Sequence, residues 1–204
     1  MCSEGSPSPR TICCVHRQRY ETRHSPCDNT AMDSLAGVLL VAAPNLLDPN
    51  FFRSVVLILE HTGEGAVGVI INRPTTSPLG DELPEWEALL AQPEVVFVGG
   101  PVQPDNAVGL AEGVDGSSLA GVGIVDLSAP PGELTAPVRI YAGYAGWGPG
   151  QLEAELVEGG WIVALAEPED VFAVEPGTLW RDVLRRQPGP TAMLATFPID
   201  PGLN

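Results

Sequence analysis

Acid–base chemistry in residues 34–204 would depend on a single histidine, because His61 is the only one in that range. Glu60 precedes it directly, and Asp48 lies ahead of the same apolar run. A histidine beside a carboxylate can act as a general acid or base, so a hydrolase-type enzyme using His61 with Glu60 or Asp48 is one hypothesis. Adjacent residues of a strand face opposite sides, so Glu60 and His61 would not chelate one metal ion without a bulge. We therefore predict no metal site and no cofactor.

Polar residues also gather where two predicted strands begin and end. Asp48, Asn50 and Arg53 precede one strand, and Asn72 and Arg73 follow its neighbour. In an antiparallel hairpin the start of the first strand lies beside the end of the second. These side chains should therefore meet at one edge of the sheet, either as structural Arg–Asp contacts or as part of a binding surface.

A glycine-rich segment, residues 143–150, joins a predicted strand to a predicted helix. Such a junction can offer backbone N–H groups to an anion, or it can form a tight turn that lets Trp147 pack under the helix. Gln151 and Glu155 share one helix face, which points either into a groove or to water. The predicted binding residues are Asp48, Asn50, Arg53, Glu60, His61, Asn72, Arg73, Gly146, Trp147 and Gln151.

Hydrophobic patterning predicts the elements that position these residues. The run 38–43 indicates a strand buried on both faces, and 54–61 with 66–72 indicates an antiparallel hairpin. Helical spacing predicts a helix near 83–90 and another at 149–158, with a last one capped by Thr178. Further strands are predicted at 95–98, 107–111, 121–126, 138–144 and 161–165. This order is typical of an α+β domain and not of regular βαβ alternation.

Composition excludes several classes of function. The ten basic residues are all arginine, so Schiff-base chemistry, pyridoxal phosphate attachment and a Walker-type phosphate loop are excluded. The net charge is -16, and residues 34–204 hold six arginines and 22 acidic residues. This balance argues against direct nucleic-acid binding. No apolar run approaches the ~20 residues of a membrane span.

The N-terminal residues differ from the rest of the chain. All four cysteines fall within the first 27 residues, at spacings that do not match a zinc motif, and the longest apolar stretch is too short for a signal peptide. We interpret residues 1–34 as a disordered tail or as an upstream extension from a wrongly assigned start. The domain is expected at 35–187, with a C-terminal extension at 188–204, in a cytoplasmic protein.

Several separated motifs resemble the AlgH/YqgE family of small bacterial proteins, over roughly residues 35–187. They are the segments 39–44, 48–56, 60–61, 65–68, 72–74, 99–102 and 143–152. The resemblance implies an α+β fold whose mostly antiparallel, bifurcated sheet is rolled into a pseudo-barrel with a few short helices. Family members are commonly labelled transcriptional regulators, but the resemblance carries over neither a reaction nor catalytic residues.

The sequence thus leaves several functions open. The first is a non-enzymatic regulatory or binding protein acting on an unidentified protein or small-molecule partner through Asp48, Arg53, Asn72, Arg73 and the glycine-rich segment. The second is the hydrolase-type enzyme using His61. Direct DNA binding is suggested only by the family label, and the oligomeric state is not predicted.

Overall fold

The computed structural model describes residues 34–77, 83–114 and 121–198. By its internal contacts the chain divides into residues 1–33 and residues 34–204. The predictions made for the N-terminal tail therefore lie outside the described residues, apart from Ser34.

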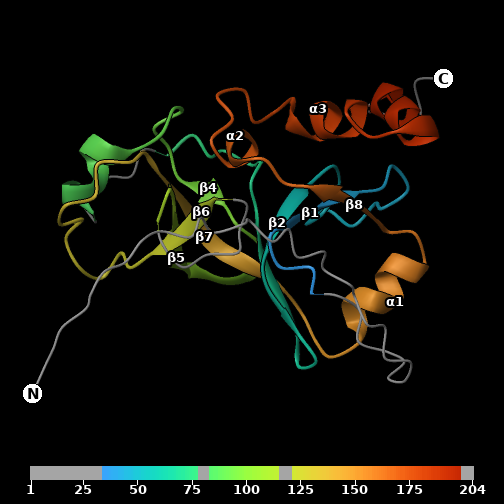
Figure 1. Cartoon of the computed structure of the whole chain (residues 1–204), viewed down its shortest axis with the longest axis horizontal. Helices are drawn as coiled ribbons and strands as arrows, with labels where there is room; N and C mark the ends of the chain where they lie inside the picture. Colours follow the sequence, from blue (N-terminus) through green and yellow to red (C-terminus); the bar gives the residue numbers. More distant parts are fainter. Residues whose placement is uncertain (1–33, 78–82, 115–120, 199–204) are drawn as a thin grey trace, which may run out of the picture. The chain divides into compact units, whose positions relative to one another are not determined.

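The described residues form a mostly antiparallel sheet of eight strands (Figure 1). Its order is β6-β5-β7-β3-β2-β1-β8, with β4 paired to β7 off this path. The strands are β1 (Val38–Ala42), β2 (Val55–Thr62), β3 (Gly65–Ile70), β4 (Phe97–Val98), β5 (Val102–Glu112), β6 (Val122–Val125), β7 (Val138–Trp147) and β8 (Trp161–Leu165). The sheet is not closed, since β6 and β8 end the order, so the barrel expected from the family resemblance is open.

Strand β7 makes the sheet bifurcate. Its first part, from Val138 to Ala142, pairs antiparallel with β5, and Tyr141 and Ala142 also pair parallel with β4. Its last residues, Ala145 to Trp147, pair with β3 instead. The sequence predicted a glycine-rich turn over this last part, and that prediction is wrong: the strand continues to Trp147, and only Gly148–Gly150 form the turn.

Strand β1 is buried on both faces, which confirms the prediction from its apolar run. Leu39 and Val41 belong to one core cluster, with Trp180 of α3 (Leu179–Arg185). Leu40 and Ala42 belong to another, with residues of α1 (Gln151–Val157). These two helices lie on opposite sides of β1 and β8 in Figure 1. The antiparallel hairpin of β2 and β3 is also confirmed.

Several short elements differ from the predictions. The helix expected near 83–90 is the 3₁₀ helix η2 (Pro84–Leu89), which buries Trp86 against the β5–β7 half of the sheet. A short helix α2 (Pro168–Val171) and the 3₁₀ helix η3 (Gly189–Thr196) were not predicted. Thr178 precedes α3 as expected, but its hydroxyl contacts Asp182 and does not cap a backbone N–H. Within the described ranges, no helix is long and apolar enough to cross a membrane.

Candidate functional site

Asn72 connects the two strands of the hairpin at their open end. Its Oδ1 accepts a hydrogen bond from the backbone N–H of Val55 at 2.9 Å, and its Nδ2 donates to the carbonyl of Arg53 at 2.9 Å. Arg53 has a left-handed backbone, with φ of 55°, which is rare for a residue with a side chain. The amide of Asn72 therefore holds Arg53 in a conformation that the chain alone would disfavour.

The other members of this strand-end cluster also contact the backbone. Arg73 donates to the carbonyls of Phe52 at 3.1 Å and Pro49 at 3.4 Å. Burial lowers the pKa of Arg73, and the charge of Asp48 partly offsets this. Asp48 accepts from the N–H of Asn50 at 2.7 Å. The structure thus brings Asp48, Asn50, Arg53, Asn72 and Arg73 to one end of the hairpin, as the strand pairing predicted.

The side chain of Arg53 leaves this loop and reaches the C-terminal residues. Its Nη2 donates to the carbonyl of Phe197 at 2.7 Å and to that of Pro198. The guanidinium carbon lies 4.4 Å from the ring centroid of Trp180, a cation–π geometry. Burial, and then the nearby charge of Arg181, lower the pKa of Arg53. Among the described residues neither arginine forms an ion pair with a carboxylate.

An apolar groove adjoins Arg53, and we call it the C-terminal groove. It encloses about 390 Å³, within the range of roughly 300–1,000 Å³ that is usual for ligand pockets. Phe197, whose carbonyl Arg53 holds, lines the groove and is 48% exposed. Met193, next to Leu194, is 70% exposed, and Leu47, two residues after Asn45, is 65% exposed. The lining residues are Ala43, Pro44, Asn45, Gly159, Ile162, Leu194 and Phe197.

His61 pairs with a carboxylate that sequence reasoning did not consider. Its Nε2 lies 2.8 Å from Glu153 of α1, and its Nδ1 accepts the backbone N–H of Leu35 at 3.1 Å. This assigns the neutral ring as the Nε2–H tautomer. A backbone hydrogen bond, and then His61, lower the pKa of Glu153. The sequence indicated Glu60 or Asp48 as the carboxylate partner of His61. Neither has that role, because Glu60 is exposed and Asp48 lies at the other end of the hairpin.

On the polar face of α1, Glu155 contacts two indole rings, while Gln151 is exposed. Glu155 accepts from Nε1 of Trp147 at 2.9 Å and of Trp161 at 2.7 Å, both on Oε2. Its Oε1 accepts from Gln151 at 2.9 Å, and Gln151 in turn accepts from the N–H of Gly148 at 3.1 Å. Both indoles are 5% exposed. These contacts favour the structural interpretation of the glycine-rich segment.

Phe51 completes the aromatic cluster beside α1. Its ring stacks on Trp147 at 6.2 Å and meets Trp161 edge-on at 5.5 Å. Gly146 lies in β7 opposite Val67, near the turn of the hairpin. The predicted residues thus fall into two groups: the strand-end cluster around Arg53, and a turn-end group of His61, Gly146, Trp147 and Gln151, with Glu60 exposed nearby.

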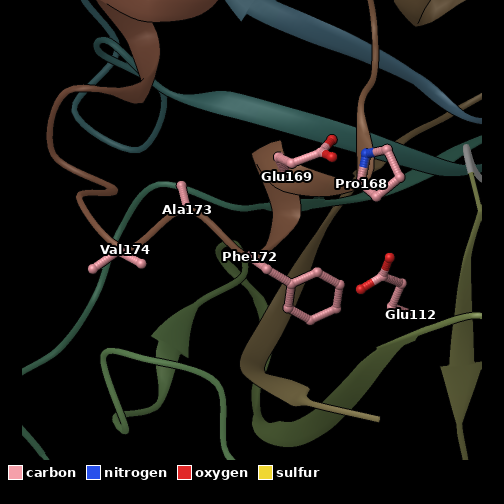
Figure 2. A pocket seen from close by; sticks show the side chains of 6 residues that line it. All are labelled: Glu112, Pro168, Glu169, Phe172, Ala173 and Val174. Atoms are coloured by element: carbon pink, nitrogen blue, oxygen red, sulfur yellow. The ribbon is translucent and has the colours of Figure 1, made fainter.

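A second pocket lies beside α2 and encloses about 350 Å³ (Figure 2). Figure 2 shows the carboxylate of Glu112 and the ring of Phe172 pointing toward one another, with Glu169 further along the wall. Behind it, Arg139 is buried and donates to the carbonyls of Val171 and Ala173, each at 3.0 Å. Arg139 therefore supports this wall from inside the core.

Metal ligands do not assemble in the part of the chain that the structure describes. No three His, Cys, Asp or Glu side chains there come close enough together to hold an ion. The cysteines and the two other histidines lie in residues 1–33, outside the described ranges.

Sequence reasoning missed Glu153, Trp180 and the C-terminal groove. Glu153 stands 92 residues from His61, and Phe197 stands 144 residues from Arg53. Local spacing carries no signal for contacts at such separations. The sequence signal that could have indicated the groove is the apolar stretch before Pro198, which lies in the segment 188–204 that was predicted to be a C-terminal extension.

The architecture defines a class of protein: an open, bifurcated, mostly antiparallel sheet with short helices on its faces. The chain belongs to the AlgH-like family, whose model matches residues 39–192. A UPF0301 protein of Streptomyces coelicolor is 53% identical over 190 residues, which cover 86% of this chain and 98% of that protein. A UPF0301 protein of Thermobifida fusca is 46% identical over 190 residues, covering 84% and 96%.

Two solved structures share the fold. A protein of Corynebacterium diphtheriae, known from its crystal structure, superposes with a TM-score of 0.74 at 34% identity, covering 83% of this chain and 95% of that one. The AlgH protein of Pseudomonas aeruginosa, known from its solution structure, gives a TM-score of 0.61 at 28% identity, covering 84% and 98%.

Proposed function

We propose that this chain is a cytoplasmic, non-enzymatic binding protein that recognises a protein partner through the C-terminal groove and Arg53. One observation carries the proposal: an apolar groove of about 390 Å³ lies open beside an arginine that has no carboxylate partner among the described residues. Aromatic residues, methionine and arginine are enriched at protein interfaces, and here Phe197, Met193 and Arg53 meet that description.

The negative charge of the chain limits the classes of molecule that can be its partner. Residues 34–204 hold six arginines against 22 acidic residues, and such a surface repels a polyanion. Direct DNA binding is therefore not part of the proposal. A regulatory role, in the sense of the label that family members carry, would operate through a bound protein.

The test compares partners that the full chain captures by cross-linking in its native cells. Asn45→Trp places a large ring at the mouth of the groove, and Asn106→Trp makes the same change on exposed β5, away from the groove. We expect a defined partner that the wild type and Asn106→Trp capture equally and that Asn45→Trp loses. Equal capture by all three proteins would overturn the proposed surface.

A second function rests on the contact between His61 and Glu153. A histidine with a fixed tautomer and a carboxylate at 2.8 Å is the orienting arrangement used in acid–base catalysis. Against it, both ring nitrogens are already engaged and the side chain is only 6% exposed. A screen of ester, amide and phosphate substrates with wild type and His61→Gln would decide: equal residual rates remove the hydrolase hypothesis.

A further inference from the structure

The C-terminal residues contact Arg53 and the groove in the way a bound peptide would. Phe197 has an extended backbone, with φ of -57° and ψ of 131°. Phe197 forms part of the wall of the C-terminal groove, while its carbonyl and that of Pro198 accept hydrogen bonds from Arg53. We call residues 197–198 the strap. An apolar residue against a groove and two backbone oxygens on a guanidinium are the contacts of a peptide ligand.

Arg53 is held in place without the strap. Its carbonyl is fixed by Asn72, and its guanidinium lies 4.4 Å from the ring of Trp180. Trp180 in turn donates from Nε1 to the carbonyl of Ala42 at 2.8 Å, in the buried interior. Because these contacts come from β1, α3 and the loop after β3, the site would persist when the strap leaves. Such preorganisation lowers the cost of binding a replacement ligand.

The strap is also a weaker ligand than the site can accept. It supplies two neutral carbonyl oxygens to Arg53, with the positive charge of Arg181 nearby. No carboxylate among the described residues pairs with either arginine. A carboxylate adds to such contacts the attraction between opposite charges and a geometry that matches the guanidinium with two parallel hydrogen bonds. An anionic group with two oxygens would therefore bind here better than the strap does, contact for contact.

The strap has the opposite advantage of being part of the same chain. An attached segment acts at a high effective concentration, in the millimolar range for short connections. The strap should therefore exclude peptides that bind only through apolar contacts, and it should be displaced by peptides that also carry a negative charge. The family model ends at residue 192, before the strap, so this contact belongs to the part of the chain beyond the matched domain.

We propose that the C-terminal groove, Arg53 and Arg181 bind the free C-terminal carboxylate of a partner polypeptide, whose last apolar side chain enters the groove, and that the strap occupies this site until it is displaced. This inference rests on the proposed function and deepens it, because it names the chemistry of the partner and an autoinhibitory segment. The bound carboxylate takes the positions of the two strap carbonyls, and the partner's last side chain enters the groove beside the wall that Phe197 now forms.

The test uses the full chain and a pool of short peptides that end in leucine or phenylalanine, made with either a free carboxylate or a terminal amide. Binding is measured by fluorescence anisotropy. We expect the wild type to prefer the acid pool over the amide pool by about tenfold. Phe197→Ala weakens the strap and should raise affinity for the acid pool by about tenfold. Ile124→Ala, at an exposed apolar position on β6, the opposite end of the strand order from the groove residue Ile162 of β8, is the matched control and should leave affinity unchanged.

Two charge variants separate the site from the fold. Arg53→Gln should abolish the preference for the acid pool, and Arg181→Gln, which removes the second positive charge near Arg53, should reduce it while folding normally. Equal binding of acid and amide pools by Phe197→Ala, or no difference between Phe197→Ala and Ile124→Ala, would overturn the inference.

The outcomes also separate this inference from the proposed function. If the amide pool binds as tightly as the acid pool, and Asn45→Trp abolishes both, the groove is a binding site and only the carboxylate and the strap are wrong. If no peptide binds any variant, the carboxylate site is wrong, and the cross-linking comparison still decides the proposed surface. A concentration-dependent dimer that the acid pool dissolves and Arg53→Gln prevents would support the site, with a second copy supplying the C-terminus.

Discussion

Replacing Glu155 with alanine should destabilise the domain, because the change leaves two indole N–H groups without their acceptor. Its Oε2 is the acceptor for both Trp147 and Trp161, at 2.9 and 2.7 Å. A buried donor left without an acceptor costs about 1–3 kcal/mol, and both indoles are 5% exposed. Because α1 lies at the surface, water replaces part of the lost contact, so we expect the free energy of unfolding to fall by about 2–4 kcal/mol. In a domain of this size, that lowers Tm by roughly 5–15 °C.

The measurement is urea unfolding followed by tryptophan fluorescence, to which these two indoles contribute together with Trp86 and Trp180. Glu158→Ala is the matched control, since it removes the same charge from an exposed position at the end of the same helix. We expect that control to change stability by no more than about 0.5 kcal/mol. Glu155→Gln keeps an oxygen acceptor and should lose only about 1 kcal/mol. A loss below about 1 kcal/mol for Glu155→Ala relative to Glu158→Ala would refute this reasoning.

Three further changes test other contacts. The lowered pKa of Glu153 means that its stabilising effect is present above the ordinary glutamate pKa and is lost as the pH falls through the lowered value. Glu153→Gln should therefore reduce the free energy of unfolding by about 0.3–1 kcal/mol at neutral pH and leave it unchanged in strong acid. A loss of stability that persists in acid would contradict this. Arg139→Met leaves buried carbonyls without their donor, so stability should fall by about 2–3 kcal/mol and α2 should exchange its amide hydrogens faster; unchanged exchange in α2 would count against this role. Gly99→Ala places a Cβ 2.2 Å from the carbonyl oxygen of Gly143 and should lower the free energy of unfolding in urea by about 2–4 kcal/mol. The control is Gly63→Ala, whose Cβ meets nothing within 4 Å. Similar losses of stability for both variants would show that the close approach at Gly99 does not matter.

The strands were predictable because the pattern of apolar residues indicates both the length of a strand and which of its faces are buried. The run from Val38 to Ala42 is apolar at every position, is short and is rich in β-branched valine, which together favour a strand covered on both faces. The Thr62–Gly65 turn fixed the pairing of β2 with β3 in the same way. The end of β7 was not predictable, because its glycines indicate a turn by type, while here Gly143 allows β7 and the Gly99–Gly100 backbone to approach closely.

The candidate site was predictable only where strand pairing brings residues together. Asn72 and Arg53 meet because one follows β3 and the other precedes β2. The partners that decide what these residues do come from elsewhere in the chain: Glu153 for His61, and Phe197 with Pro198 for Arg53. Such contacts follow from how the helices fold back on the sheet, which no local pattern specifies.

The division of β7 between the two halves of the sheet affects how the domain can come apart. Residues 138–142 hold β4 and β5, and residues 145–147 hold β3. Neither half can separate while this strand stays in place, and once it leaves, both halves lose a neighbour together. Partial opening should therefore begin at the outer strands β6 and β8, and the central seam should be the last part of the molecule to meet solvent.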